Sequence, residues 1–132
     1  MHTDVSLLLP ESEVASVAPV DADLLIRFSA ACVVRIDVGE GEKPIQGFAR
    51  GIVLQLHGAQ IVAAHEPLLG RISDGRLQAG GEWLKALALP FECEGSVRLE
   101  LAFANRSELV ATGSGIMVRF DAEPNFTESL AC

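Results

Sequence analysis

The stretch Val97-Arg98-Leu99-Glu100-Leu101-Ala102-Phe103 has the clearest periodicity in the chain. Every second side chain is apolar, and Arg98 and Glu100 occupy positions between the apolar ones. A period of two residues is typical of a β-strand that packs one face on a core and leaves the other in water. The sequence therefore predicts that the four apolar residues of this stretch face one common core.

The same period recurs on both sides of this stretch. Apolar residues alternate with other residues in four further segments: Leu24–Phe28, Val34–Val38, Ile52–Leu56 and Ile116–Phe120. All twelve glycines lie between Gly39 and Gly115, at short intervals that suit turns between strands. Asn105-Arg106-Ser107 is a predicted hairpin turn, because polar turn-forming residues separate two apolar segments there.

Three segments have no clear period. Residues 1–20, which contain two prolines, are predicted to be an extended acidic lead-in with a short edge strand at Val5–Leu9. Trp83–Leu89 has residues that suit a helix, but the flanking glycines and proline leave barely two turns, so a strand is predicted. Gln60–Leu69 is compatible with one helical turn ended by Pro67.

The chain has 132 residues and a mass of 14.0 kDa, which fits one domain spanning 1–132. About seven or eight half-buried strands in so small a chain must close into a barrel or fold into a sandwich, because an open sheet would leave one apolar face in water. We therefore expect an all-β fold, either a small antiparallel β-barrel or a sandwich, with at most one short helix.

The formal net charge is −8 and the sequence pI is about 4.7, which argues against a nucleic-acid partner. The acidity lies in residues 1–23 and 121–132, which contain no Lys or Arg, whereas residues 24–120 are balanced. These acidic ends are either solvated tails or a surface for a basic protein. In the second case the candidate partner surface consists of Asp21, Asp23, Asp121, Glu123 and Glu128.

The three cysteines, Cys32, Cys93 and Cys132, form no C-x-x-C pair, and an odd number cannot close completely into intramolecular disulfides. We therefore expect three free thiols and a reducing compartment. The N-terminal residues have no cationic segment, so no signal peptide is predicted. No stretch approaches the roughly 18–20 apolar residues of a membrane span. We expect a cytoplasmic protein without a membrane partner.

No group of residues predicts catalysis, a metal or a cofactor. His57 and His65 are not spaced to share a local metal site, and Pro67 prevents the helix that an H-E-x-x-H motif requires. A metal site assembled across strands from these histidines and an acid stays open. Gly113-Ser114-Gly115 lacks the wider pattern of a nucleophile turn. The alternating acids of 39–42 have the wrong charge for a phosphate loop.

Three segments, 69–72, 99–105 and 120–129, resemble a recurring arrangement of small bacterial β-domains. In those domains a strand of the form L-x-L-x-F and a polar turn precede a final strand and a terminal aromatic-x-E-S. Here the terminal motif is Phe126-Thr127-Glu128-Ser129, without a terminal Trp. Some of these domains resemble toxin-immunity proteins. The resemblance implies an all-β fold and no catalytic residue.

Three functions agree with these observations. A non-catalytic protein-binding or assembly module is favoured, because no catalytic constellation is present in the sequence. An immunity-type inhibitor of a basic toxin is a specific form of this function, suggested by the acidic ends and the resemblance. The alternative is a small-ligand carrier or an enzyme that uses a barrel cavity. We expect a monomer or a small homo-oligomer.

Overall fold

The computed structural model describes residues 2–38 and 44–128, which form nine β-strands and no helix. The strands are β1 His2–Val20, β2 Asp23–Val38, β3 Ile45–His57, β4 Gln60–His65, β5 Gly70–Ala79, β6 Glu82–Leu84, β7 Ala86–Ala88, β8 Phe91–Phe103 and β9 Glu108–Glu128. A membrane-spanning helix is accordingly not found in this part of the chain.

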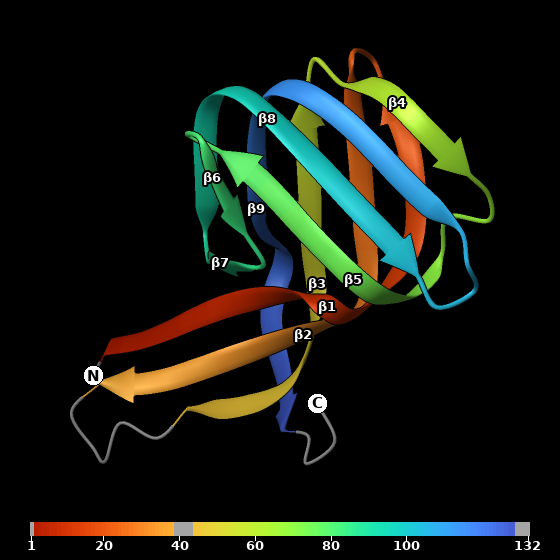
Figure 1. Ribbon diagram of the computed structural model, residues 1–132. Helices are drawn as coiled ribbons and strands as arrows, with labels where there is room; N and C mark the ends of the chain where they lie inside the picture. The colour runs from red at the N-terminus through yellow and green to blue at the C-terminus, as the bar shows by residue number, and fades with distance from the viewer. Residues whose placement is uncertain (1, 39–43, 129–132) are drawn as a thin grey trace.

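Six of the strands close into an antiparallel barrel (Figure 1). Their order is β5-β8-β9-β3-β2-β1, and β1 returns to β5 through the pairs Glu13↔Arg71 and Val14↔Gly70. The three remaining strands extend this barrel, since β4 pairs with β9, β6 with β5 and β7 with β1. The predicted all-β class is confirmed, and of the two architectures that the sequence left open the barrel is the one adopted.

The core of the barrel is almost entirely aliphatic. Its largest fully buried side chains are Leu7, Leu9, Ile26, Ile52, Leu54, Leu56, Ile72, Leu77, Leu87, Leu99, Leu109 and Ile116. The four apolar residues of Val97–Phe103 are all buried, as their period predicted. Burial of each such side chain contributes about 1.5–3 kcal/mol before the entropy of ordering is subtracted. The core therefore depends on many similar aliphatic contacts and on few aromatic rings.

The predicted lead-in is a full-length strand of the barrel. The expected edge strand Val5–Leu9 is not an edge, because Ser6–Leu8 pair with β2 on one side and with β7 on the other. After Leu8 the register shifts, and the buried Ser12 occupies the irregularity. Its Oγ donates to the Leu8 carbonyl (2.6 Å) and accepts from the Cys32 amide (2.8 Å). This hydroxyl satisfies backbone groups that the bulge leaves unpaired.

Two further segments that lacked a clear period are strands. Gln60–Leu69 contains β4 and not a helical turn, because its backbone pairs with β9 from Gln60↔Thr112 to His65↔Glu108. Trp83–Leu89 contains β6 and β7, separated at Lys85, so the predicted extended conformation is confirmed. The hairpin turn at 105–107 is also confirmed by a hydrogen bond from the Phe103 amide to the Ser107 carbonyl.

The second half of β2 departs from the predicted face. The sequence placed Val34 and Ile36 on one apolar face, but Val33 is the fully buried residue and Ile36 is exposed. The pairs Val14↔Phe28 and Glu13↔Ala30 mark an irregularity that inverts the alternation. Beyond it, the N-terminal part of β1 and the C-terminal part of β2 extend from the barrel together with the start of β3 and the end of β9 (Figure 1).

Candidate functional site

A transverse row of five side chains crosses the outer face of the barrel. The strand register pairs Trp83 with Gln78, Gln78 with Arg98, Arg98 with Thr112 and Thr112 with Gln60, on β6, β5, β8, β9 and β4. Directly paired residues share one face of a sheet. At about 4.8 Å per strand, this polar row is about 19 Å long.

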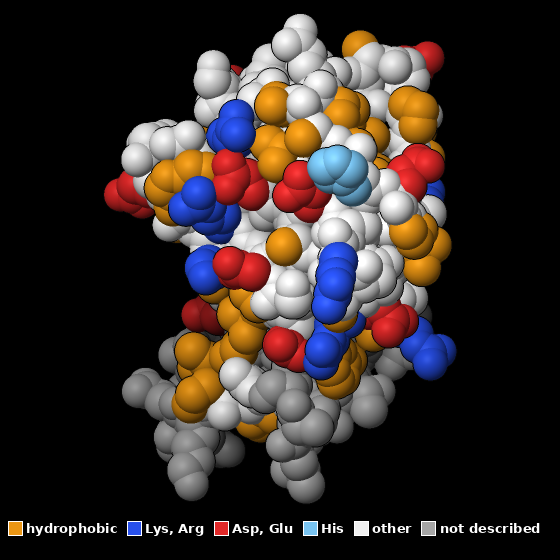
Figure 2. Space-filling view, turned by 45° about the vertical axis from the view of Figure 1, so that its right-hand side comes forward, with side chains coloured by type: hydrophobic (Ala, Val, Ile, Leu, Met, Phe, Trp, Pro, Cys, Tyr) orange, Lys and Arg blue, Asp and Glu red, His pale blue; other side chains and the backbone are white. Residues whose placement is uncertain are grey.

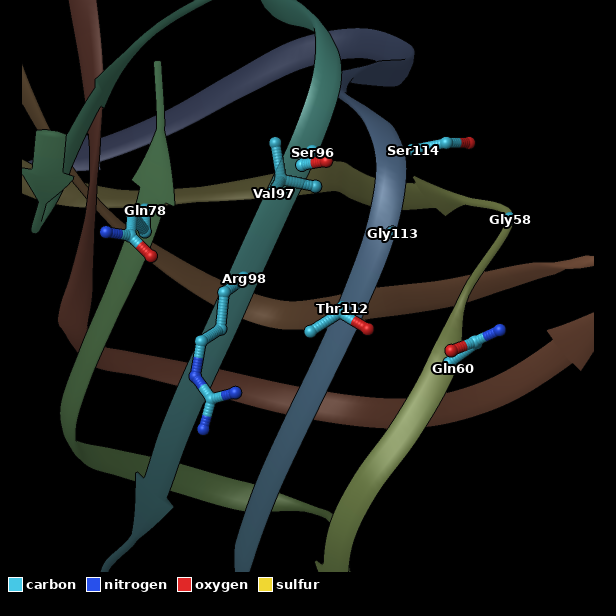
Figure 3. A pocket seen from close by; sticks show the side chains of 9 residues that line it. All are labelled: Gly58, Gln60, Gln78, Ser96, Val97, Arg98, Thr112, Gly113 and Ser114. Atoms are coloured by element: carbon cyan, nitrogen blue, oxygen red, sulfur yellow. The ribbon is translucent and has the colours of Figure 1, made fainter. Parts of the chain in front are cut away.

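The polar row borders a hollow of about 480 Å³ (Figure 3). Ser96 and Ser114 add hydroxyl groups to its lining, and Gly58 and Gly113 add open backbone. A Cβ atom on Gly113 would approach the His57 carbonyl oxygen to 2.6 Å, and one on Gly58 would approach Ser114 Oγ to 2.7 Å. Close packing against the β3 backbone therefore requires glycine at 113, whereas the positive φ of +55° favours glycine at 58.

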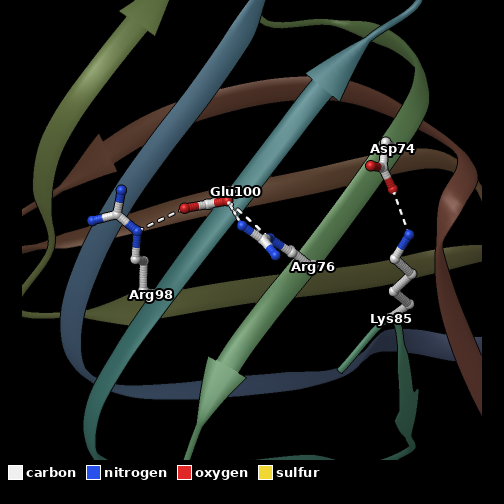
Figure 4. Close-up of polar contacts among 5 residues, drawn as sticks. All are labelled: Asp74, Arg76, Lys85, Arg98 and Glu100. Atoms are coloured by element: carbon white, nitrogen blue, oxygen red, sulfur yellow. Dashed lines mark hydrogen bonds and ion pairs between the residues drawn. The ribbon is translucent and has the colours of Figure 1, made fainter. Parts of the chain in front are cut away.

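A chain of charged contacts fixes Arg98 at the centre of the row (Figure 4). Arg98 Nε donates to Glu100 Oε2 (2.7 Å), and Arg76 lies 2.9 Å from Glu100 Oε1. The guanidinium carbon of Arg76 lies 3.9 Å from the centroid of the Trp83 ring. The guanidinium groups of Arg98 and Arg76 lower the pKa of Glu100. Two cations share one carboxylate, which leaves a net positive charge at the row.

The positive and negative charges on the surrounding surface are otherwise balanced. Lys85 Nζ lies 2.9 Å from Asp74 Oδ1, and this ammonium group lowers the pKa of Asp74. Figure 2 shows acidic, basic and hydrophobic side chains interspersed over the visible face, without a large region of one charge. A face on which the charges are mixed in this way is not an electrostatic surface for a polyanion.

Most of the polar row is not used to hold the fold. Gln60, Gln78 and Thr112 make no side-chain hydrogen bond or ion pair with another residue in the described ranges, and neither do the terminal nitrogens of Arg98. The Arg98 side chain is 38% exposed, so its terminal nitrogens are accessible. The row thus offers two carboxamides, a hydroxyl and a guanidinium to a ligand.

A second region lies where β1 and β4 separate, and we term it the β1–β4 opening. At one end the Ala59 amide donates to the Ala22 carbonyl (2.8 Å), and at the other Val14 pairs with Gly70. Between these points the facing edges of β1 (residues 15–20) and β4 have no ladder partner in the described part of the chain. Two strand edges with free backbone groups therefore border one opening.

The β1–β4 opening is also where exposed apolar side chains gather. Of the six exposed large hydrophobic residues in the described ranges, four border it: Val20, Ile61, Val62 and Leu69. A groove of about 360 Å³ lies between residues 15–17 and 66–69. Ile61 pairs with the buried Ala111, so it points toward the inner side of the sheet, yet it is 51% exposed. It is exposed because no strand covers β4 on that side.

Neighbouring turns hold the far wall of the opening in place. Asn105 Nδ2 donates to the carbonyls of Pro67 and Leu69, each at 3.3 Å, and Ser107 Oγ donates to the Pro67 carbonyl (2.7 Å). Asp21 and Glu66 are exposed at the two ends of the opening and form no ion pair within the described ranges. The opening therefore has an ordered wall and an exposed carboxylate near each end.

Two of the five predicted partner-surface carboxylates are engaged within the barrel. Asp23 accepts hydrogen bonds from Gln55 Nε2 (2.8 Å) and the Gly58 amide (3.1 Å), and it lies 3.2 Å from His57 Nδ1. These hydrogen bonds lower its pKa. Asp121 pairs with Arg27 (2.9 Å) and Arg119 (3.1 Å), which lower its pKa in the same way.

The other three predicted carboxylates are differently placed. Asp21 lies in the β1–β2 turn at the end of the opening. The side chains of Glu123 and Glu128 lie outside the described part of the structure. The Glu128 backbone pairs with Gly47, which in turn pairs with Val33, ten residues along β2 from Asp23. That separation is about 33 Å of strand. A single patch of all five residues stays a prediction.

The two histidines do not meet. His57 lies beside Asp23, whereas His65 Nδ1 lies 3.1 Å from Glu108 Oε1. Within residues 2–38 and 44–128, no group of three His, Cys, Asp or Glu residues is placed to hold a metal ion. Ser114 lies within β9 and donates to the His57 carbonyl (3.3 Å), a backbone contact and not a nucleophile–base pair.

The prediction of three free thiols is wrong for Cys32, which is disulfide-bonded. Cys93 is free, and Cys132 lies outside the described residues. An odd number of cysteines prevents complete pairing but leaves room for one pair. The disulfide bond of Cys32 removes part of the reason to expect a reducing compartment, and a cytoplasmic location stays a prediction.

The sequence pattern predicts Arg98 and Glu100 only as residues on the solvent-exposed face of a strand. The polar row depends on the strand register, which brings together residues 60, 78, 98 and 112 from four strands. The adjacent apolar residues Ile61 and Val62 are a signal for the opening, but they lie in the segment Gln60–Leu69, whose sequence is also compatible with one helical turn. No family model, curated protein or solved structure matches this chain.

Proposed function

We propose that the chain is a non-catalytic protein-binding module that takes up an extended, basic segment of a partner protein in the β1–β4 opening. The observation that carries this proposal is the pair of unpartnered strand edges bordered by four exposed apolar side chains. An added strand gains main-chain hydrogen bonds from such an edge and specificity from side-chain contacts on alternate positions.

The chemistry of the partner follows from the rim of the opening. Asp21 and Glu66 place carboxylates at its two ends, and the apolar groove lies between them. An extended segment with Val, Ile or Leu on one face and Lys or Arg near its ends complements both features. A basic toxin is one partner of this kind, so the immunity function remains a special case of the proposal.

The test uses synthetic extended peptides as probes. We expect a peptide that alternates Val or Ile with Lys to bind, and to shift and protect the backbone amide signals of residues 15–20 and 60–65 in nuclear magnetic resonance spectra. A matched peptide with Glu in place of Lys should bind at least tenfold more weakly. Binding of both peptides alike, or shifts confined to other strands, would overturn the proposal.

Substitutions then locate the site. Val62→Lys and Leu69→Lys should each weaken binding of the Lys peptide about tenfold or more, because they add a cation and remove apolar contact area. Ile36→Lys is the matched control, since Ile36 is an exposed apolar residue near the C-terminal end of β2, outside the opening. Equal loss in Ile36→Lys, or concentration-dependent dimerisation through β4 in place of peptide binding, would contradict the proposed occupant.

A further inference from the structure

We infer that the polar row is a second binding site, separate from the β1–β4 opening, and that its ligand is a short saccharide chain. The inference does not depend on the proposed protein partner. It starts from the uncommitted polar groups of Gln60, Gln78, Arg98 and Thr112 around a hollow of about 480 Å³ (Figure 3). That volume is in the range of pockets for small ligands.

The hydrogen-bonding groups of the row match hydroxyl groups. Each sugar hydroxyl is both a donor and an acceptor, and so are the carboxamides of Gln60 and Gln78 and the hydroxyl of Thr112. Ser96 and Ser114 line the same hollow with further hydroxyls. A ligand with several neighbouring hydroxyl groups would satisfy these side chains in a way that an apolar ligand would not.

The charge of the row restricts the ligand further. Arg98 is pinned through Nε to Glu100, which leaves its two terminal nitrogens as a donor fork for neighbouring oxygens. This cation disfavours an amine ligand. The nearby carboxylates Glu100 and Asp74 are paired with three cations, which leaves an excess of one positive charge, too little to hold a polyanion such as nucleic acid. A neutral saccharide, or one with a single carboxylate, fits this balance.

The length of the row and its aromatic end indicate a chain of several sugar rings. The row is about 19 Å long, which exceeds one ring. At its β6 end, Trp83 is 41% exposed, and Arg76 stacks on one face of the indole. The apolar C–H face of a pyranose packs well on the remaining indole surface. Trp83 thus provides a stacking position, and the glutamines and Arg98 provide hydrogen bonds along the row.

Trp83 is the one tryptophan of the chain, so its fluorescence reports on this site. The probes are soluble β-1,3-glucan, xylan, galactomannan and chitin oligosaccharides. We expect at least one of them to change the Trp83 emission saturably and to retard the protein in a native gel that contains the polysaccharide. No change with any of the four at millimolar sugar concentration would overturn the inference.

Variants test whether the row itself is the site. The double substitution Gln60→Ala and Gln78→Ala should weaken binding about tenfold or more, and Thr112→Val about threefold, since hydrogen bonds are lost without removal of core residues. Gln46→Ala, at an exposed glutamine of β3, is the control and should bind normally. Unchanged affinity in the double variant would overturn the inference.

Two crossed measurements separate this site from the proposed partner groove. Val62→Lys should retain saccharide binding, and Gln78→Ala, on β5 and outside the opening, should retain binding of the Lys peptide. Saccharide binding that is lost in Val62→Lys but kept in the double glutamine variant would place the sugar in the β1–β4 opening and contradict the polar row as its site.

Discussion

Strands β8 and β4 have similar apolar content but opposite surroundings. In β8, Leu99 and Leu101 lie between paired strands and are buried. In β4, Ile61 also points to the inner side of the sheet, but it is half exposed because β4 pairs on one edge alone within the described residues. An apolar side chain on the inner face is therefore buried where paired strands on both edges close the sheet around it.

The largest expected difference between the two strands follows from placing an aspartate at an inner-facing position of each. Leu101→Asp should prevent folding, because it buries an unpaired carboxylate in the aliphatic core. Ile61→Asp should leave the protein folded, with a stability change within about 0.5 kcal/mol, as for other exposed positions. Circular dichroism and urea unfolding measure both. A folded Leu101→Asp variant would contradict the assignment of this residue to the core.

The second largest effect on stability is expected at Ser12, in the bulge of β1. Ser12→Ala should lower the free energy of unfolding by about 1–3 kcal/mol, because the Leu8 carbonyl and the Cys32 amide each lose a buried partner. Urea unfolding measures the change. Ser16→Ala, at an exposed position of the same strand, is the control and should be nearly neutral. Equal effects of the two substitutions would show that the bulge hydroxyl has no special role.

A smaller effect is expected at the wall of the opening. Asn105→Ala removes two hydrogen bonds to the 67–69 backbone and should cost about 1 kcal/mol of stability. It should also speed amide hydrogen exchange in residues 68–71 more than in β8. A uniform change in exchange across both regions would contradict a local anchoring role for this side chain.

The smallest effect comes from the carboxylates of the outer face. Guanidinium groups hold the pKa of Glu100 below its usual value of 4.5, so the unfolded chain takes up its proton first as the pH falls. The stability that Glu100 contributes is therefore full above pH 4.5 and declines as the pH drops through the lowered pKa of the folded state. Urea unfolding between pH 3 and 7 should show a shallower decline in Glu100→Gln than in Glu92→Gln.

The features predicted correctly from sequence are those set by neighbouring residues. The alternation in Val97–Phe103 and the turn at 105–107 depend on side chains a few positions apart. The wrong predictions concern features that depend on pairing with strands far away in the sequence. β1 receives its second neighbour from β7, about eighty residues later, and the bulge near Glu13 inverts the face of β2.

The pattern of residues along the chain is sufficient to specify an all-β fold and the buried face of β8. The tertiary structure alone decided that the sheet closes as a barrel, that residues from five strands form the polar row, and that β1 and β4 leave an opening. The physical reason is that a two-residue period assigns a side chain to one face of a strand. Register and edge exposure depend on backbone pairing between segments far apart in the chain.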